Sequence, residues 1–354
     1  MNDNDIRIDS HKLIYHPEVV SQWLKGKMIY PIELEIAPSG ACNHRCIFCA
    51  VDYIGYKSVS LDKDLIINMV KELHPLGLKS IIHAGEGEPL LNKNIGEILN
   101  AIKEIGVDSA MSSNGVLLTK KLSQEVLHAL KWIRFSISAV TPSIYSKIHR
   151  TKESDIDKVL NNLEEAVAVK RDQKLKTTLG SQLLLIPENI NDVINTALAL
   201  KKTGIDYLSI KPYSQHPESK NVIEIDYKPL LELESRLKEI ETDDFRIFFR
   251  ASAMKNKILR KNYDQCYGLP FFSYIDANGS VWPCISFLGN EKYCYGNLYK
   301  NTFVEIWNSE NKMLVDKKIS ELDLNKECRE ICRNNEINKY LYELKNPSEH
   351  VNFI

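Results

Sequence analysis

The sequence lacks long apolar runs and has almost no net charge. No stretch approaches the roughly 20 apolar residues that span a bilayer, and the N-terminal residues MNDNDIRIDSHK lack the apolar core of a signal peptide. The 46 basic and 47 acidic residues are intermixed and leave a formal charge of -1. These absences predict a cytoplasmic protein that binds neither membranes nor nucleic acid.

Cysteine is the residue type whose distribution is informative. The eight cysteines occur in three groups, at positions 42/46/49, 266/284/294 and 328/332. A cytoplasmic chain rarely uses cysteine for a disulfide framework, so this clustering indicates metal sites. At 354 residues the chain is long enough for one large α/β unit and a smaller appendage.

The first cysteine group lies in the stretch CNHRCIFCA, which follows a strand-like run at residues 32–36. Cys42, Cys46 and Cys49 have the spacing C-x3-C-x2-C. Three thiolates can hold three irons of a 4Fe-4S cube and leave the fourth iron without a protein ligand, which makes a reactive site. Two other interpretations remain open: a zinc site that takes His44 as its fourth ligand, and buried thiols that bind no metal.

Apolar β-type runs alternate with helical patterns from residue 32 to about residue 212, which is typical of βα units around a parallel sheet. The predicted strands cover 32–36, 79–83, 109–112, 133–137, 178–185 and 207–210, and the predicted helices cover 62–74, 95–105, 122–130, 156–169 and 191–201. We therefore predict an α/β fold, a partial (β/α)6 barrel of the TIM type. The chemistry of such a barrel lies on loops at the carboxyl ends of its strands.

Three regions are predicted along the chain. Residues 1–30 form an N-terminal lead-in, residues 31–225 form the barrel, and residues 226–354 form a small domain built from a β-hairpin and a helix. A charged helix at 228–240 and an apolar run at 245–249 are interpreted as the bridge out of the barrel.

The first cysteine loop, with Phe48 directly before its third cysteine, resembles the signature of the radical S-adenosylmethionine (SAM) superfamily. The resemblance implies that Cys42, Cys46 and Cys49 hold a 4Fe-4S cluster whose open iron is chelated by the amino and carboxylate groups of SAM. One electron then cleaves SAM to methionine and a 5'-deoxyadenosyl radical. It also implies an electron donor such as flavodoxin or ferredoxin.

The loop after the second predicted strand, AGEGEPL, resembles the GGEP motif with which this family binds the amino group of SAM. Glu86 interrupts the motif, so Gly87, Glu88 and Pro89 are the positions that match, with Glu88 as the acceptor.

Two later strand ends also resemble SAM-contacting positions of the family. Asn114 lies in the turn SSNG, and Ser138 follows the fourth predicted strand. Ordinary turn residues remain an open alternative for Asn114. The adjacent pair His149 and Arg150 could bind a carboxylate, but a solvated basic pair is the preferred interpretation.

The sixth predicted strand ends in a dense polar cluster. Lys211, Tyr213, Gln215 and His216 could orient a polar substrate or exchange a proton there. A polar surface loop is an equally good interpretation.

The second cysteine constellation has the pattern C-x12-G-x4-C from Cys266 to Cys284, around a hairpin whose turn covers residues 276–279. Cys328 and Cys332 follow on a predicted helical turn. Four thiolates complete the ligand set of a second 4Fe-4S cluster, and structural zinc is the alternative. The layout resembles the SPASM or twitch extension of radical SAM enzymes, and five cysteines fit the one-cluster twitch form.

Cys294 is the thiol left over. It is interpreted either as a small buried residue or as a catalytic hydrogen-atom donor of the kind that some radical SAM epimerases require. Together the motifs predict a radical SAM oxidoreductase, either a dehydrogenase or an epimerase. The predicted substrate is a small polar molecule: a sugar, polyol, aminocyclitol or nucleotide-linked sugar. A peptide-modifying maturase and a non-catalytic iron-sulfur or zinc protein are the alternatives.

Overall fold

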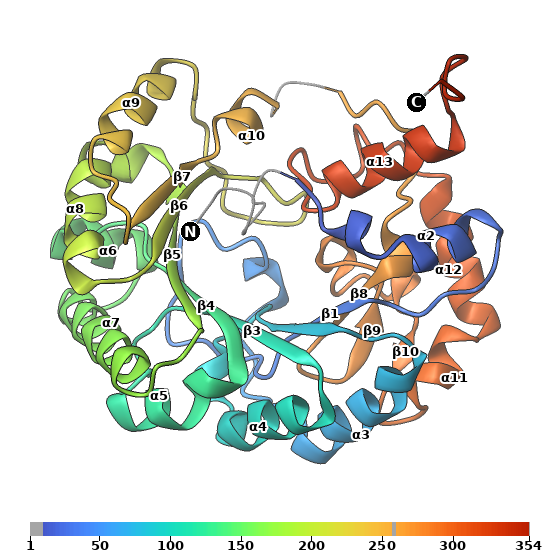
Figure 1. Ribbon diagram of the computed structural model, residues 1–354, viewed down its shortest axis with the longest axis horizontal. Helices are drawn as coiled ribbons and strands as arrows, with labels where there is room; N and C mark the ends of the chain where they lie inside the picture. The colour runs from blue at the N-terminus through green and yellow to red at the C-terminus, as the bar shows by residue number, and fades with distance from the viewer. Residues whose placement is uncertain (1–9, 257–259, 354) are drawn as a thin grey trace.

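A single ten-stranded sheet forms the core of the computed structural model, which describes residues 10–256 and 260–353 (Figure 1). Its strands occur in the order β10-β9-β8-β1-β2-β3-β4-β5-β6-β7. The sheet curves into an incomplete barrel, and most of the helices lie outside it (Figure 1).

Seven parallel strands form the barrel wall. They are β1 (Glu33–Ile36), β2 (Ser80–His83), β3 (Asp108–Ser113), β4 (Leu130–Ser136), β5 (Thr178–Leu185), β6 (Tyr207–Pro212) and β7 (Arg246–Phe249). The six predicted strands are all present. The expected bridge at 245–249 is wrong, because β7 pairs with β6 as a further strand of the same wall.

The helices of the barrel cover its outer face. They are α3 (Lys63–Leu73), α4 (Ile95–Ile105), α5 (Lys120–Val126), α6 (Pro142–His149), α7 (Ser154–Asp172), α8 (Val193–Thr203) and α9 (Leu233–Lys238). Asp62 caps α3 by accepting a hydrogen bond from the Leu65 N–H group at 2.9 Å. The sequence interpretation missed α6, whose eight residues are too few for a clear helical period.

Alternation along β1 separates an apolar layer from a polar barrel interior. Leu34 and Ile36 are fully buried in the apolar cluster that includes α3 and α4. Successive side chains of a strand point to opposite faces, and Glu35 accordingly lines a cavity inside the barrel. The wall thus presents charged groups inward, toward the mouth where the strands end.

The C-terminal region continues the barrel sheet. β8 (Phe272–Ile275) pairs in parallel with β1, and β9 (Ser280–Trp282) and β10 (Gly296–Asn297) extend it in antiparallel fashion. The predicted hairpin is confirmed, and Gly279 takes φ +78° in its turn. The remaining helices are α10 (Ala251–Asn256), α11 (Phe303–Trp307), α12 (Glu310–Ser320) and α13 (Asn335–Lys345). Cys328 and Cys332 lie in irregular turns before α13 and not on the expected helical turn.

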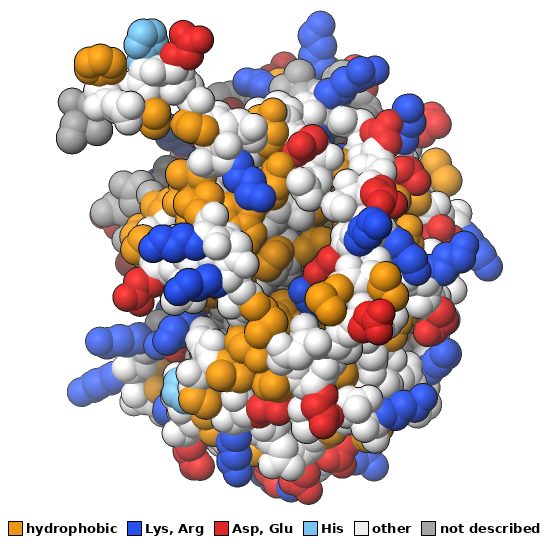
Figure 2. All heavy atoms as spheres, turned by 90° about the vertical axis from the view of Figure 1, so that its right-hand side faces the viewer, with side chains coloured by type: hydrophobic (Ala, Val, Ile, Leu, Met, Phe, Trp, Pro, Cys, Tyr) orange, Lys and Arg blue, Asp and Glu red, His pale blue; other side chains and the backbone are white. Residues whose placement is uncertain are grey.

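The N-terminal lead-in packs on the C-terminal region. Its helix α2 (Pro17–Leu24) contributes Val20 to an apolar cluster with Tyr267, Phe271 and Leu341. Charged side chains of both signs are interspersed on the face of the molecule where α11 and α12 lie (Figure 2). Within residues 10–256 and 260–353, no helix combines the length and the apolar character that crossing a membrane requires.

Trp307 allows a test of whether the barrel and the C-terminal region share one apolar core. Its indole N–H donates to the Ile29 carbonyl at 2.8 Å, and its ring stacks on Phe303 in the apolar cluster that includes Leu34. We expect Trp307→Ala to lower the free energy of unfolding by about 3–5 kcal/mol, seen as a lower urea midpoint of the iron-loaded protein. Leu314→Ala, at a side chain that is 51% exposed, is the control. Equal midpoint shifts in the two variants would contradict the claim that the barrel and the C-terminal region share one apolar core.

Candidate active site

A cavity of ≈ 300 Å³ occupies the mouth of the barrel, and Cys42, Cys46 and Cys49 all line it. Burial, and then the neighbouring thiols Cys42 and Cys49, raise the pKa of Cys46 well above its ordinary value. Burial also raises the pKa of Cys42 to about 11. Such thiols ionise readily only beside positive charge, which iron supplies. The donor set therefore fits a metal cluster that faces the cavity.

The end of α6 holds the cysteine loop in place. The N–H groups of Arg45 and Ile47 donate to the carbonyls of His149 and Ile148, at 3.0 and 2.9 Å. His149 is fully buried, and its Nδ1 lies 3.2 Å from Sγ of Cys46. Burial lowers the pKa of His149 well below its ordinary range. The expectation of a solvated basic pair is therefore wrong for His149.

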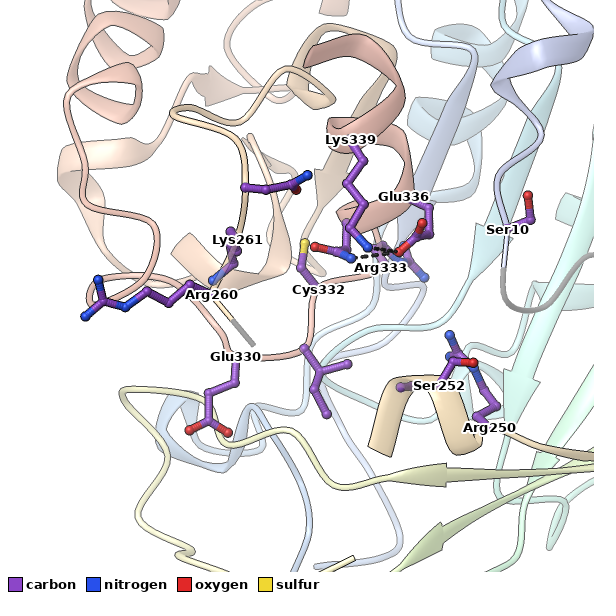
Figure 3. A pocket seen from close by; sticks show the side chains of 14 residues that line it. Ser10, Arg250, Ser252, Arg260, Lys261, Glu330, Cys332, Arg333, Glu336 and Lys339 are labelled. Carbon is purple, nitrogen blue, oxygen red and sulfur yellow. Dashed lines mark hydrogen bonds and ion pairs between the residues drawn. The ribbon is translucent and has the colours of Figure 1, made fainter. Parts of the chain in front are cut away.

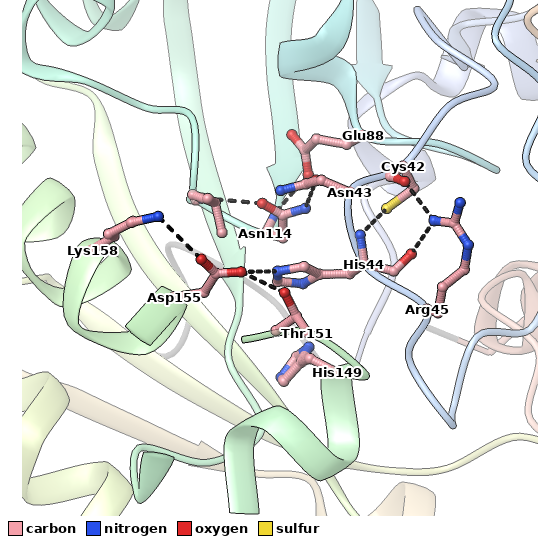
Figure 4. A network of polar contacts seen from close by, with 12 residues as sticks. Cys42, Asn43, His44, Arg45, Glu88, Asn114, His149, Thr151, Asp155 and Lys158 are labelled. Carbon is pink, nitrogen blue, oxygen red and sulfur yellow. Dashed lines mark hydrogen bonds and ion pairs between the residues drawn. The ribbon is translucent and has the colours of Figure 1, made fainter. Parts of the chain in front are cut away.

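Glu88 joins the ends of β2 and β3. Its buried carboxylate accepts hydrogen bonds from the Ser113 hydroxyl and the Asn114 N–H group, each at 2.7 Å. The Asn114 side chain in turn donates to Asn43 of the cysteine loop at 2.6 Å (Figure 4). Burial raises the pKa of Glu88, whereas these donors lower it. The structure thus brings Glu88, Asn114 and the cysteine loop together at the cavity.

Gly87 and Pro89 shape the glutamate loop. A Cβ atom on Gly87 would lie 1.9 Å from the Ser39 carbonyl oxygen, so only glycine fits there. Pro89 begins a short 3-10 turn in which the Glu88 carboxylate accepts from the Leu90 N–H group. The loop thereby packs directly on the backbone that precedes the cysteines.

Glu86, the residue that interrupts the motif, connects this loop to the C-terminal hairpin. Its carboxylate accepts hydrogen bonds from the Tyr274 hydroxyl and, at 2.8 Å, from the Ala277 N–H group. Burial raises the pKa of Glu86 to about 7. The departure from the motif has a structural reason, because the extra carboxyl ties the loop to β8.

The structure separates the two serines at the end of β4. Ser136 lines the cavity, whereas Ser138 lies outside it. Ser138 is buried, and its N–H group lies 3.3 Å from Nε2 of His149. The SAM contact of Ser138 remains a prediction, but Ser136 is the better placed serine. Strand alternation could not distinguish the two, because residues two apart point to the same face of a strand. Phe48 lines the cavity as predicted, with its ring edge-on to His149 at 5.4 Å.

Basic side chains also line the cavity. Arg134, Lys211 and Arg333 line it from β4, β6 and the C-terminal region. Burial, and then the charge of Arg134, lower the pKa of Lys211 well below its ordinary value. Arg333 forms an ion pair with Glu35 of β1. The sequence interpretation missed both arginines, because neither lies in a recognisable motif.

The other residues of the predicted polar cluster lie outside this cavity. Tyr213 is buried and donates to Gln215 at 2.9 Å. His216 stacks on Tyr53, with ring centroids 4.9 Å apart. Of the four residues predicted there, only Lys211 reaches the cavity.

The four remaining predicted ligands gather in the C-terminal region. Burial, and then the charges of Cys328, Cys266 and Cys284, raise the pKa of Cys332 well above its ordinary value. All four are free thiols. N–H groups of Asn338 and Asn334 lie 3.6 Å from Sγ of Cys266 and 3.3 Å from Sγ of Cys332. Such donors are typical of iron-sulfur sites, so this set also fits a cluster.

Cys294 lies apart from both cysteine sets. Its thiol is 3.4 Å from the Gly296 carbonyl oxygen and packs in a cluster with Ala37 and Trp282. It lines neither the barrel cavity nor the cavity between α10 and α13. The proposed role as a hydrogen-atom donor has no geometric support here.

A second cavity, of ≈ 370 Å³, lies between α10 and α13 (Figure 3). Arg333 lines both cavities. Cys332 reaches the second cavity from the C-terminal cysteine set. Basic side chains also line it from three segments of the chain: Arg250, Arg260, Lys261 and Lys339.

Two family models match this chain. Residues 36–212 match the model of the radical SAM superfamily. The chain belongs to the radical SAM superfamily. Residues 266–334 match the model of the SPASM iron-sulfur cluster-binding domain. This radical SAM enzyme therefore uses SAM, a SAM-binding 4Fe-4S cluster and an auxiliary cluster.

Curated relatives resemble part of the chain. It is 29% identical over 167 residues to a protein from Saccharolobus solfataricus and 30% identical over 165 residues to one from Methanocaldococcus jannaschii, each named "Probable GTP 3',8-cyclase". These alignments cover 47% and 45% of this chain and 49% and 52% of the relatives. The chain thus spans about half the length of the curated relatives it matches.

Solved structures resemble the fold over almost the whole chain. SuiB of Streptococcus suis, bound to the precursor peptide SuiA, has a TM-score of 0.66 and 18% identity, covering 95% of this chain and 78% of SuiB. The AdoMet-bound enzyme anSMEcpe has a TM-score of 0.57 and 17% identity, covering 87% of this chain and 88% of that chain. At such identities the likeness shows the fold, a partial barrel with a C-terminal auxiliary domain.

These comparisons correct the predicted substrate. The prediction of oxidation or epimerisation of a sugar, polyol, aminocyclitol or nucleotide-linked sugar is wrong. The curated relatives are named as GTP cyclases, and the solved neighbours SuiB and anSMEcpe have structures with bound peptides. Membership of the radical SAM enzymes is confirmed, whereas a dehydrogenase or epimerase activity is not.

Glu86 gives a prediction for the pH dependence of stability. Its pKa of about 7 in the folded protein lies above the ordinary value of 4.5. The stability that the protonated carboxyl contributes is fully present below pH 4.5 and is lost as the pH rises through about 7. A rise of this size limits the contribution of Glu86 to the free energy of unfolding to roughly 3 kcal/mol.

We expect the melting temperature of the wild type to fall more between about pH 5 and about pH 8 than that of Glu86→Gln, because glutamine stays neutral. Glu104→Gln, on the exposed side of α4, is the matched control and should follow the wild type. Parallel pH profiles for the wild type and Glu86→Gln would show that Glu86 does not titrate in this range.

Proposed function

We propose that this radical SAM enzyme oxidatively modifies a peptide that carries acidic groups. In this proposal Cys42, Cys46 and Cys49 hold the SAM-cleaving cluster. The auxiliary cluster has four ligands, which are Cys266, Cys284, Cys328 and Cys332. The observation that carries the proposal is Arg333, whose side chain lines both the barrel cavity and the open cavity beside the auxiliary cysteines.

The chain's own residues would bind and orient SAM at the barrel mouth. Glu88 is the proposed acceptor for the amino group, and Gly87 and Pro89 set the path of its loop. Asn114 and Phe48 border the same cavity. When bound, the SAM-cleaving cluster supplies the electron that cleaves SAM and yields a radical able to remove hydrogen from an unactivated C–H bond. The buried walls of β1 to β6 keep solvent from that reaction.

A peptide fits the shape and charge of the route to this site. The second cavity lies between α10 and α13 and presents basic side chains from separate segments. An extended peptide with a carboxylate could bind there and reach the barrel cavity past Arg333. The likeness of the whole chain to the peptide complex of SuiB supports this proposal. A flavodoxin or ferredoxin remains the proposed electron donor.

A nucleoside triphosphate is the second candidate substrate. The basic groups around Lys211 favour it, because Arg134 and Arg333 line the same cavity. The names of the curated relatives also point to GTP. GTP is the weaker candidate, because the alignments cover only about half of those relatives. Adding GTP to the reduced holoenzyme separates the two, because a cyclase consumes GTP as it forms 5'-deoxyadenosine.

Iron counting tests the two ligand sets. Anaerobically reconstituted wild type should hold about eight irons per chain and release 5'-deoxyadenosine from SAM under dithionite. Cys46→Ala should retain about four irons and lose SAM cleavage, whereas Cys332→Ala should retain about four irons and keep it. Cys294→Ala is the matched control and should keep all of the iron. SAM cleavage by Cys46→Ala would refute the proposed SAM-cleaving site.

Charge reversal tests the acidic peptide. Lys339 lines the second cavity beside Glu336, at 2.9 Å (Figure 3). We expect Lys339→Glu to weaken the binding of a fluorescent Glu-rich peptide to the holoenzyme roughly fivefold, as the loss of one exposed ion pair allows. Lys326→Glu makes the same charge change at a residue that is 82% exposed, outside the cavity. Equal effects of the two substitutions would indicate nonspecific attraction.

A further inference from the structure

His149 is a buried histidine with no role in the proposed function. It ends α6, and its ring lies against those of Tyr145, Phe48 and His44, with centroids 4.3, 5.4 and 5.4 Å away. Its main-chain carbonyl accepts a hydrogen bond from the Arg45 N–H group. The imidazole is therefore held from several sides at a defined position against the cysteine loop.

The two ring nitrogens of His149 have different partners, and these partners determine the tautomer. The Ser138 N–H group lies 3.3 Å from Nε2. Because a backbone N–H group can only donate, Nε2 must carry the lone pair and the ring proton must be on Nδ1. Nδ1 lies 3.2 Å from Sγ of Cys46, so its N–H group is directed at that sulfur.

We infer that His149 is a positioning residue that raises the reduction potential of the SAM-cleaving cluster by donating an N–H···S hydrogen bond to Cys46. The inference rests on the proposed assignment of Cys46 as a cluster ligand. Hydrogen bonds to the sulfurs are among the factors that set the potential of an iron-sulfur cluster. A donor stabilises the reduced form more than the oxidised form, because reduction adds negative charge to the sulfurs.

The arrangement also explains why α6 ends where it does. Ile148 and His149 use their free terminal carbonyls to bind the cysteine loop, and the His149 side chain then reaches its middle cysteine. Arg150 follows in the left-handed region, at φ 48°, and caps the helix there. One helix end thus supplies both the backbone support and the donor.

The test compares three substitutions in the iron-loaded full chain. His149→Asn keeps an amide nitrogen near the position of Nδ1, whereas His149→Gln moves it toward that of Nε2. His149→Phe keeps a ring but has no donor. Redox titration followed by EPR measures the potential, and the signal that changes when SAM is added identifies the SAM-cleaving cluster. His128→Phe, at an exposed residue, is the control for substituting a histidine.

At a fixed potential, His149→Phe and His149→Gln are expected to lower the ratio of reduced to oxidised cluster roughly tenfold, a downward shift of about 59 mV for one electron. His149→Asn should stay close to the wild type. The inference is overturned if His149→Phe and His149→Gln match the wild type, or if His149→Asn shifts as far as they do. Should His149→Phe fail to assemble its cluster, the asparagine and glutamine variants still give the comparison.

Metal analysis separates failure of this inference from failure of the cluster assignment. The ligand atoms of His44, Cys46 and His149 lie within 4.8 Å of one another, which is also close enough for zinc. Zinc in the reconstituted wild type, or full iron content in Cys46→Ala, would overturn the cluster assignment. If Cys46→Ala loses about four irons but the His149 variants keep the reduction potential of the wild type, only the role of His149 is overturned.

Discussion

The pairing of β1 with a strand on each side is the interaction on which the rest of the structure depends. β2 pairs with one edge of β1 and β8 pairs with the other, both in parallel and over the same four residues. The C-terminal region is therefore part of the barrel sheet and shares its apolar core. Because parallel strands end at the same edge of a sheet, the loops after β1, β2 and β8 meet at the barrel mouth.

Two polar connections, each with a buried carboxyl group, hold this junction in register. The Glu86 carboxylate accepts hydrogen bonds from Tyr274 and Ala277, which ties the glutamate loop to the hairpin. Arg333, near the auxiliary cysteines, forms an ion pair with Glu35 inside the barrel. A buried charge is tolerated only with such partners. Each contact therefore depends on the other domain being in place, and the two proposed cluster sites are held in a fixed relationship.

Much of the fold could be predicted because its signals are local. Strand runs such as 178–185 and helices such as 95–105 carry their periodicity in consecutive residues, and both have the predicted bounds. The seventh strand, β7, was missed because its run is only four residues long and follows a charged helix. α6 was missed because eight residues hold barely two helical turns.

The sequence by itself determined the family, the three cysteine groups and the glutamate loop, because the spacing of ligands and the residues of tight turns are local features of the chain. It could not determine that Ser136 faces the cavity while Ser138 lies outside it, or that Cys294 lies apart from both cavities. Nor could it place Arg134, Arg333 and His149, which reach the site from separate elements. Only the tertiary structure decided these, because burial and hydrogen-bond partners depend on which distant segments the sheet brings together.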